Sequence, residues 1–379
     1  MNNVRIRRGT AAAAAAAVVV AGLVTAAGPA AAAAPCTPKI QVLGALTPDT
    51  YDPDSVQTQG VLDFGAGNLS VGVSGGKPVY WTGTILHKVP LADPNAGGRV
   101  LAVNRHGLMV GVLHDTAGTT LFSYRKGAAA VTTLPGGHGY DMEADVNDAG
   151  YIVSRGTPGG VVWKDGVKVR DLPVPADAGP GTRIEMVTGI NGRGDVLGMA
   201  EQDYEVPETG QHLQGSHPVL WPGDGSPART LAPSGSGTLE SSHVQDIDES
   251  GRIVGYDWRG PWHEYRPFVW TPPHTGPGSS PGVLSTHPYG TLEAISPTTN
   301  VSVGTAKFHP ESMTLQDQAQ WWPGSGPVLA LPRLAKDAPS TADAVTDDDR
   351  VGGAAVNAKG RLKPVIWTCA SKQAYSPGR

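Results

Sequence analysis

The sequence predicts an all-β protein, a seven-bladed β-propeller in which an N-terminal strand completes the last blade. Three observations support this fold class. A turn pattern, Asn or Asp followed after two residues by Gly and then by an apolar strand, recurs along the chain. Each copy precedes one aromatic anchor, and successive anchors lie 39 to 58 residues apart. The 51 Gly and 33 Pro, against only 17% charged residues, indicate many turns and few long helices.

The turn pattern predicts a tight connection between two strands in every repeat. The first side chain can bond back to its own turn, and the Gly supplies the positive φ that the return strand needs. The copies are AVNRHGLMVGV (102–112), DVNDAGYIVSR (145–155), GINGRGDVLGM (189–199) and DIDESGRIVGY (246–256), with more divergent ones at 62–72, 294–304 and 344–354.

The aromatic anchors end the third strand of each repeat. They are Trp81, Tyr124, Trp163, Trp221, Trp270, Trp322 and Trp367. One strand precedes the turn, one follows it, one ends at the anchor, and a short apolar segment such as ARTLA supplies the fourth. Four strands per repeat and seven repeats predict a propeller closed around a central channel, and periods of this length are typical of such arrays.

The first 34 residues have the pattern of a secretory signal peptide. Three arginines precede an apolar run from Ala11 to Val24, and an A-x-A cleavage site falls within 30–34. We therefore expect a secreted protein with one propeller domain at 35–371 and a short tail at 372–379. Without the signal, 26 basic residues face 34 acidic ones, which argues against binding to nucleic acid or to anionic membranes.

The two cysteines lie near the two ends of the predicted domain. The seventh repeat stops after the strand of Trp367, and KIQVLGAL (39–46) has the apolar pattern of the missing fourth strand. Pairing of that segment with the C-terminal strand would close the ring and bring Cys36 beside Cys369. Because secreted chains normally pair their cysteines, we predict a disulfide bond between them.

The repeat as a whole resembles a known protein family. The pattern [AD]-[IV]-N-x-x-G-x-[IV]-V-G followed by x-P-x-x-W is similar to that of the HAF-repeat family of secreted bacterial proteins. The resemblance covers nearly all of residues 38–369. It implies a propeller-like extracellular protein, and it brings no catalytic residues to carry over.

One face of the predicted propeller carries the long insertions. In an up-and-down blade, the links between second and third strands lie on the face opposite the Asn-x-x-Gly turns. Three successive repeats enlarge these links, at 200–216, 257–266 and 305–318. Aromatic and imidazole side chains among polar residues there suit a sugar or peptide ligand; alternatively, they pack the loops onto the blades. The candidates are Tyr204, Trp258, Trp262, His263, Tyr265, Phe308 and His309.

The stretch DIDESGRIVGYD also approaches the spacing of an EF-hand calcium loop. Its candidate ligands are Asp246, Asp248, Ser250 and Asp257. The sister copies lack this acidic set, which favours a turn and leaves calcium as the alternative. No phosphate-binding loop and no CxxC pair is present, so no cofactor is predicted.

These features predict a monomeric, non-catalytic extracellular binding module whose ligand is a glycan, a cell-wall component or a protein. The alternative is a propeller hydrolase or lyase acting on an extracellular polysaccharide, because such enzymes place acids or imidazoles at the channel mouth. Its candidate residues, Glu143, Glu185, His243, Glu293 and Asp343, stand at differing distances from the turn residue, so no common ring of them is expected.

Overall fold

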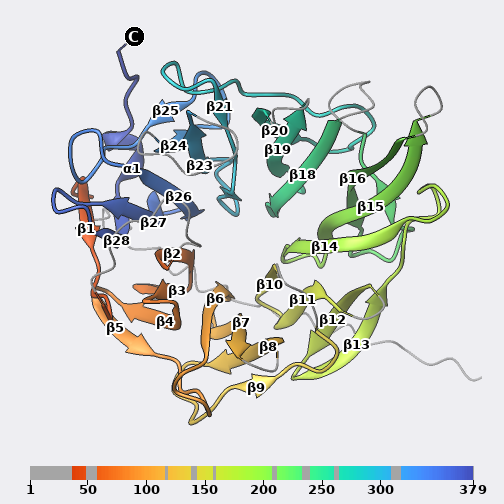
Figure 1. Cartoon of the computed structure of the whole chain (residues 1–379), viewed down its shortest axis with the longest axis horizontal. Coiled ribbons are helices and arrows are strands. Elements are labelled where there is room, and N and C mark those ends of the chain that lie inside the picture. Colours follow the sequence, from red (N-terminus) through yellow and green to blue (C-terminus); the bar gives the residue numbers. More distant parts are fainter. Residues whose placement is uncertain are drawn as a thin grey trace, which may run out of the picture. The chain divides into compact units, whose positions relative to one another are not determined.

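The computed structural model confirms the seven-bladed β-propeller. It describes residues 36–47, 58–115, 118–137, 143–156, 159–206, 211–232, 240–259, 264–308 and 317–378. From Cys36 onward the chain is one compact unit, whose seven antiparallel sheets follow one another around a ring (Figure 1). The predicted signal peptide lies outside the described residues.

Each blade is one sheet built from consecutive strands. Blade 1 contains β2 (Gln59–Phe64), β3 (Leu69–Ser74), β4 (Lys77–Thr82) and β5 (Ile85–Lys88). Blade 2 contains β6 (Gly97–Val103), β7 (Leu108–Asp115), β8 (Gly118–Arg125) and β9 (Thr132–Thr133). Blade 3 contains β10 (Ala144–Val146), β11 (Tyr151–Arg155), β12 (Gly160–Lys164) and β13 (Val167–Leu172). Blade 4 contains β14 (Arg183–Ile190), β15 (Val196–Val206), β16 (Gln211–Trp221) and β17 (Arg229–Thr230).

Blades 5 and 6 depart from the simple four-strand order. Blade 5 has β18 (Glu240–Ile247), β19 (Ile253–Arg259) and β20 (Glu264–Trp270), with one isolated bridge from Val269 to Ser279 in place of a fourth strand. Blade 6 divides its inner strand into β21 (Tyr289–Gly290) and β22 (Ala294–Ile295), followed by β23 (Ser302–Lys307), β24 (Gln318–Trp322) and β25 (Leu329–Ala330). Blade 7 has β26 (Ser340–Val345), β27 (Arg350–Val356), β28 (Leu362–Thr368) and β1 (Lys39–Val42).

The Asn-x-x-Gly copies are hairpin turns, as predicted. Asn104 Oδ1 accepts the backbone N–H groups of His106 and Leu108, both at 3.0 Å, and Gly107 has φ 74°. The side chain has a second role that the pattern did not predict. Asn104 Nδ2 donates to the backbone carbonyl of Asn147, the equivalent turn residue of the next blade, at 3.0 Å. The turn residue therefore fixes both its own hairpin and the neighbouring blade.

The seven aromatic anchors occupy equivalent, buried positions. Their exposed fractions range from 0 to 9%. Trp163 Nε1 donates to the carbonyl of Pro135, which follows the outer strand of the preceding blade, at 3.0 Å. Trp81 makes the same contact with Gly44, just after β1, at 2.8 Å. The blade that precedes blade 1 in the ring is therefore blade 7, and the N-terminal strand β1 is its outer strand.

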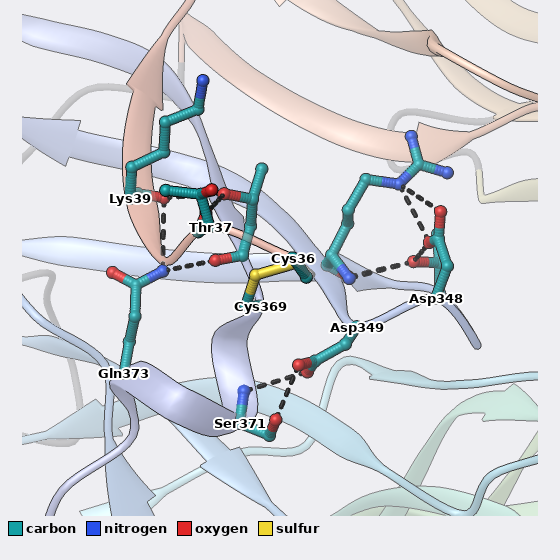
Figure 2. The surroundings of a disulfide bond; sticks show 11 residues. Cys36, Thr37, Lys39, Asp348, Asp349, Cys369, Ser371 and Gln373 are labelled. Carbon is teal, nitrogen blue, oxygen red and sulfur yellow. Dashed lines mark hydrogen bonds and ion pairs between the residues drawn. A yellow bond between two sulfur atoms is a disulfide. The ribbon is translucent and has the colours of Figure 1, made fainter. Parts of the chain in front are cut away.

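The N-terminal strand closes the ring as predicted. β1 pairs antiparallel with β28, with Lys39 opposite Thr368. The disulfide joins Cys36 to Cys369, whose Cα atoms lie 5.9 Å apart (Figure 2). Beyond it, α1 (Ala370–Gln373) is held by Ser371, which donates its backbone N–H and its hydroxyl to the Asp349 carboxylate at 2.9 and 2.6 Å. The closure is therefore both hydrogen-bonded and covalent.

The first enlarged link differs from the expectation. Instead of a loop over 200–216, β15 and β16 continue their pairing as far as Val206 opposite Gln211. Continued pairing satisfies the backbone N–H and C=O groups of the insertion, which a long loop would leave to water. The predicted C-terminal tail is also anchored in part, since Tyr375 and Ala330 of β25 exchange two backbone hydrogen bonds of 2.9 and 3.0 Å.

Across the part of the chain that the structure describes, no helix has the length and apolar character needed to cross a membrane.

Candidate functional site

Four ring side chains gather on blade 5, and we call His243, Tyr256, Trp258 and Tyr265 the blade-5 ring cluster. The residues two apart on β19 share a face, and cross-strand pairing places His243 opposite Tyr256 and Trp258 opposite Tyr265. His243 stacks on Tyr256 with centroids 5.0 Å apart and planes 9° apart. The rings of Trp258 and Tyr265 lie 6.5 Å apart at 23°. Strand pairing therefore assembles the cluster on a rigid sheet.

The electrostatics of the cluster keep His243 and Tyr256 neutral. Burial lowers the pKa of His243 to about 4, so its imidazole carries no charge near neutral pH. Burial also raises the pKa of Tyr256, and the nearby carboxylate of Glu293 adds to that shift. Tyr256 consequently stays a phenol and contacts the side chain of Gln245. Through Gln245 and Glu293, the cluster adjoins the centre of the ring.

The centre of the ring is a cavity of about 390 Å³. Residues on or beside the innermost strand of every blade line it, and carboxylates predominate among the polar ones. Glu143, Glu293 and Asp343 come from blades 3, 6 and 7. Burial raises the pKa of Glu293, although Thr291 and the positive charge of Lys307 both act to lower it. The cavity is thus an acidic site that the blade-5 ring cluster borders.

Three further aspartates line the cavity from blades 1, 3 and 5. Each accepts two backbone N–H groups, one from its own strand and one from the next blade; for Asp145 these are Val146 and Ile190, at 2.6 and 2.8 Å. Burial raises the pKa of Asp145 to about 6 and that of Asp246 to about 7, while that of Asp63 also lies well above its ordinary value. These carboxyls serve the scaffold, because backbone donors occupy their oxygens.

Two of the seven residues predicted from the enlarged links meet in the cluster, namely Trp258 and Tyr265. Phe308 is 41% exposed and contacts the His287 ring edge-on, with centroids 6.4 Å apart. Tyr204 lies on β15, and its side chain is not described. Trp262, His263 and His309 lie outside the described residues.

Sequence reasoning did not assign Tyr256 or Gln245 to the site, and it considered His243 only as a possible catalytic group. Tyr256 directly follows the repeated G-x-[IV]-V-G segment at 251–255, which indicated a structural strand and no ligand contact. The period-two spacing of Tyr256 and Trp258 was the one available signal, but it required knowing that β19 continues past the predicted strand end.

The enzymatic candidates come closer together than their spacing indicated. Glu143, Glu293 and Asp343 line one cavity, although the sequence predicted no common ring. In blade 7 the strand register shifts between Ala342 and Ala344, so Asp343 sits at a bulge that turns its side chain. Glu185 lies elsewhere and accepts a hydrogen bond from the Ser216 hydroxyl at 2.7 Å.

The calcium candidates divide between the two ends of β19. Asp248 Oδ1 accepts the backbone N–H groups of Ser250 and Arg252 at 2.8 and 2.7 Å, as a turn residue does. Asp257, at the far end, accepts the Ser242 hydroxyl at 2.9 Å. Among the described residues, no group of three or more Cys, His, Asp or Glu side chains is placed to hold a metal ion.

A second cavity, of about 560 Å³, lies between blades 4 and 5 on the side of the Asn-x-x-Gly turns. In its lining, Arg193 pairs with Asp195 at 2.7 Å, and His274 Nε2 lies 2.8 Å from the Gly251 carbonyl oxygen. Of the predicted site residues only Ser250 lines it, whereas Glu143, Glu293 and Asp343 line the central cavity, which adjoins the blade-5 ring cluster at Gln245 and Glu293. We therefore take the central cavity and the blade-5 ring cluster as the candidate site.

The sequence matches no protein-family profile, and no characterised relative was found by sequence. Several solved structures are similar in fold. TolB from Acinetobacter baumannii shares 13% identity at a TM-score of 0.40, and the match covers 71% of this chain and 65% of that chain. YCF48 from Cyanidioschyzon merolae shares 12% identity at a TM-score of 0.47, with 84% and 99% covered. YCF48 bound to a D1 peptide shares 11% at 0.42, with 86% and 94% covered. Likeness at this level says nothing about the ligand of this chain.

Proposed function

We propose that this chain is a secreted, non-catalytic binding protein of the HAF-repeat type. It captures an extracellular ligand, a glycan or a peptide, at the blade-5 ring cluster. One observation carries the proposal: stacked neutral rings border an acid-lined cavity on a rigid sheet. Aromatic side chains supply a large contact area with little loss of conformational entropy, which suits recognition of a ligand from solution.

Partial exposure of the cluster supports a binding role over a packing role. The anchor tryptophans, which pack between blades, are at most 9% exposed. Trp258 and Tyr265 are only half-buried, although they belong to the same blade as the fully buried Trp270. Rings that served packing alone would gain more free energy by complete burial.

The secreted location rests on two features that support each other. Residues 1–34 have the pattern of a signal peptide, and Cys36 and Cys369 form a disulfide. Disulfides persist mainly in oxidising compartments outside the cytosol.

A polysaccharide hydrolase or lyase remains the second candidate, because Glu143, Glu293 and Asp343 line one cavity. The raised pKa of Glu293 would suit a general acid. Release of products from a bound polysaccharide would favour this candidate over pure binding.

The test is capture of ligands by the purified mature chain on an array of glycans, cell-wall fragments and peptides. We expect Trp258→Ala and Tyr265→Ala to weaken capture at least about tenfold, which corresponds to about 1.4 kcal/mol. Tyr151→Ala is the matched control, since Tyr151 is an aromatic residue of blade 3 with 40% exposure and no part in the cluster.

The thermal melt of each variant separates binding from packing. Capture lost with an unchanged melting temperature supports the proposal. If ligand capture and melting temperature fall together, Trp258 and Tyr265 have a structural role instead. If the array shows no capture by the unmodified chain, the proposed function is wrong.

A further inference from the structure

The charge of the central cavity is strongly one-sided. Glu143, Glu293 and Asp343 bring carboxylates from three blades. Among the described lining residues, Arg99 is the only basic one. Transfer of these carboxylates from water into a cavity costs free energy, as the raised pKa of Glu293 shows. A positively charged guest would offset that cost, whereas a neutral or anionic guest would not.

An ammonium group of the protein already occupies the border between the cluster and the cavity. The Lys307 ammonium lies 5.4 Å from the centre of the Tyr265 ring, within the range of a cation–π contact. Its charge also acts on Glu293 and lowers the pKa of that carboxyl. The position beside an aromatic face and a buried carboxylate therefore suits a primary ammonium, and Lys307 shows which chemistry fits there.

The rings favour a sugar as the carrier of such a group. Trp258 and Tyr265 stand opposite each other on neighbouring strands, with ring centroids 6.5 Å apart and planes 23° from parallel, and both are half-buried, so they present an apolar surface at one place on the sheet. The flat apolar face of a pyranose ring covers such a surface more fully than the narrow chain of a lysine. An amino sugar places this face and its ammonium on one rigid ring.

We propose that the ligand is a glycan with free amino groups, whose ring packs on Trp258 and Tyr265 and whose ammonium enters the acidic cavity. This inference rests on the proposed function and names its ligand class. Lys307 competes with the ligand for the same carboxylate. Removal of Lys307 should therefore tighten binding, whereas removal of a cavity carboxylate should weaken it.

The experiment is calorimetric titration of the mature chain with two β-1,4-linked tetramers, one of glucosamine and one of N-acetylglucosamine. Acetylation removes the charge and keeps the sugar backbone. We expect the glucosamine tetramer to bind at least about tenfold more tightly, and added salt to reduce the difference. Glu293→Gln and Glu143→Gln should reduce the preference several-fold, while Lys307→Met should increase affinity for the charged tetramer.

Each outcome decides the question. Equal affinities for the two tetramers overturn the inference but leave the proposed binding function intact. Failure of both tetramers to bind also overturns it, and the array then decides the proposed function independently. If neither tetramer binds but a lysine-bearing peptide binds more tightly than its acetyl-lysine form, the cation site recognises peptides. That result would contradict the proposed amino-sugar ligand. Lys307→Met should raise affinity for the charged tetramer, and Glu293→Gln should lower it. Misfolding could only lower affinity, so it cannot produce both changes.

Discussion

The interfaces between blades fall into two kinds, six between blades that follow one another in the chain and one between blade 7 and blade 1. Each of the six carries a carboxylate that accepts a backbone N–H across the interface. At interfaces 1–2, 3–4 and 5–6 the pairs are Asp63 with Val103, Asp145 with Ile190, and Asp246 with Ile295. At interfaces 2–3, 4–5 and 6–7 they are Asp148 with Arg105, Glu249 with Gly192, and Asp347 with Thr298.

These carboxylates alternate between two places in the repeat. The first group stands two residues before the turn residue and lies at the cavity. The second stands just after the turn residue; of its three members, Glu249 also lines the cavity, whereas Asp148 and Asp347 do not. The side chain of Asp148 is 43% exposed. The pattern thus repeats every two blades, with acids supplied by odd-numbered blades.

A two-blade pattern cannot run without interruption around a ring of seven. Blade 7 meets blade 1 through contacts of another kind, including the Arg350 guanidinium 4.9 Å from the Phe64 ring. β1 and the disulfide to Cys369 hold this interface as well. The closing interface therefore depends on the chain ends, where the other six depend on repeated side chains.

The largest expected effect is at the closing interface. Replacing both cysteines, Cys36→Ala with Cys369→Ala, removes a crosslink that spans 333 residues. Chain entropy sets an upper limit of ~5–6 kcal/mol on the loss of unfolding free energy, and real losses are usually smaller. Urea unfolding of the double variant beside the unmodified chain measures it. A loss no larger than that from an exposed interface residue would show that β1 alone closes the ring.

The next effect compares the two kinds of carboxylate. Asp145→Ala leaves two buried N–H groups without a partner, and we expect a loss of about 2–3 kcal/mol. Asp148→Ala is the matched control from the same blade. Its partner groups are exposed to water, so a loss below about 1 kcal/mol is expected. Equal losses in chemical denaturation would contradict the distinction between the two positions.

The pH dependence sharpens the same comparison. The folded-state pKa values of about 7 for Asp246 and about 6 for Asp145 lie above the ordinary 3.8. The folded state therefore binds these protons more readily, so their contribution to stability is lost as pH rises through 6 to 7. His243, with a pKa lowered to about 4, acts oppositely as pH falls below its ordinary 6.5.

Between pH ~8 and ~6.5, where the aspartates dominate, we expect unfolding free energy to increase as pH falls. The Asp246→Asn variant should show a shallower slope in denaturation curves over this interval, whatever its absolute stability. An unchanged slope would mean that Asp246 does not titrate there.

The smallest expected effect concerns calcium at Asp246, Asp248, Ser250 and Asp257. Backbone groups and Ser242 already occupy oxygens of the three carboxylates. We therefore expect no change in melting temperature on adding a chelator or calcium. A rise that grows with calcium concentration would reveal a site, because a ligand that binds only the folded state must stabilise it.

The sequence by itself determined the ring. The turn pattern, the anchors from Trp81 to Trp367 and the apolar segment beside Cys36 are local signals with a fixed spacing, and each repeat needs only its neighbours to bury its strands. The number of blades, the equivalent anchors and the closing strand therefore follow from the sequence. The residue two places before the turn residue is Asp in blades 1, 3 and 5 and Ala or Gly in the other blades, and this can also be read from the sequence. Nothing local in the sequence shows which groups the three Asp carboxylates contact.

Only the tertiary structure decided how the blades are joined and where the rings meet. The Asn104 side chain reaches Asn147 because neighbouring turns stand side by side, a distance that sequence spacing does not encode. Likewise, His243 and Tyr256 join Trp258 because β18 and β19 pair past the predicted ends of their strands. Such contacts depend on strand register and on the twist between blades, and both arise from the packing of the whole ring.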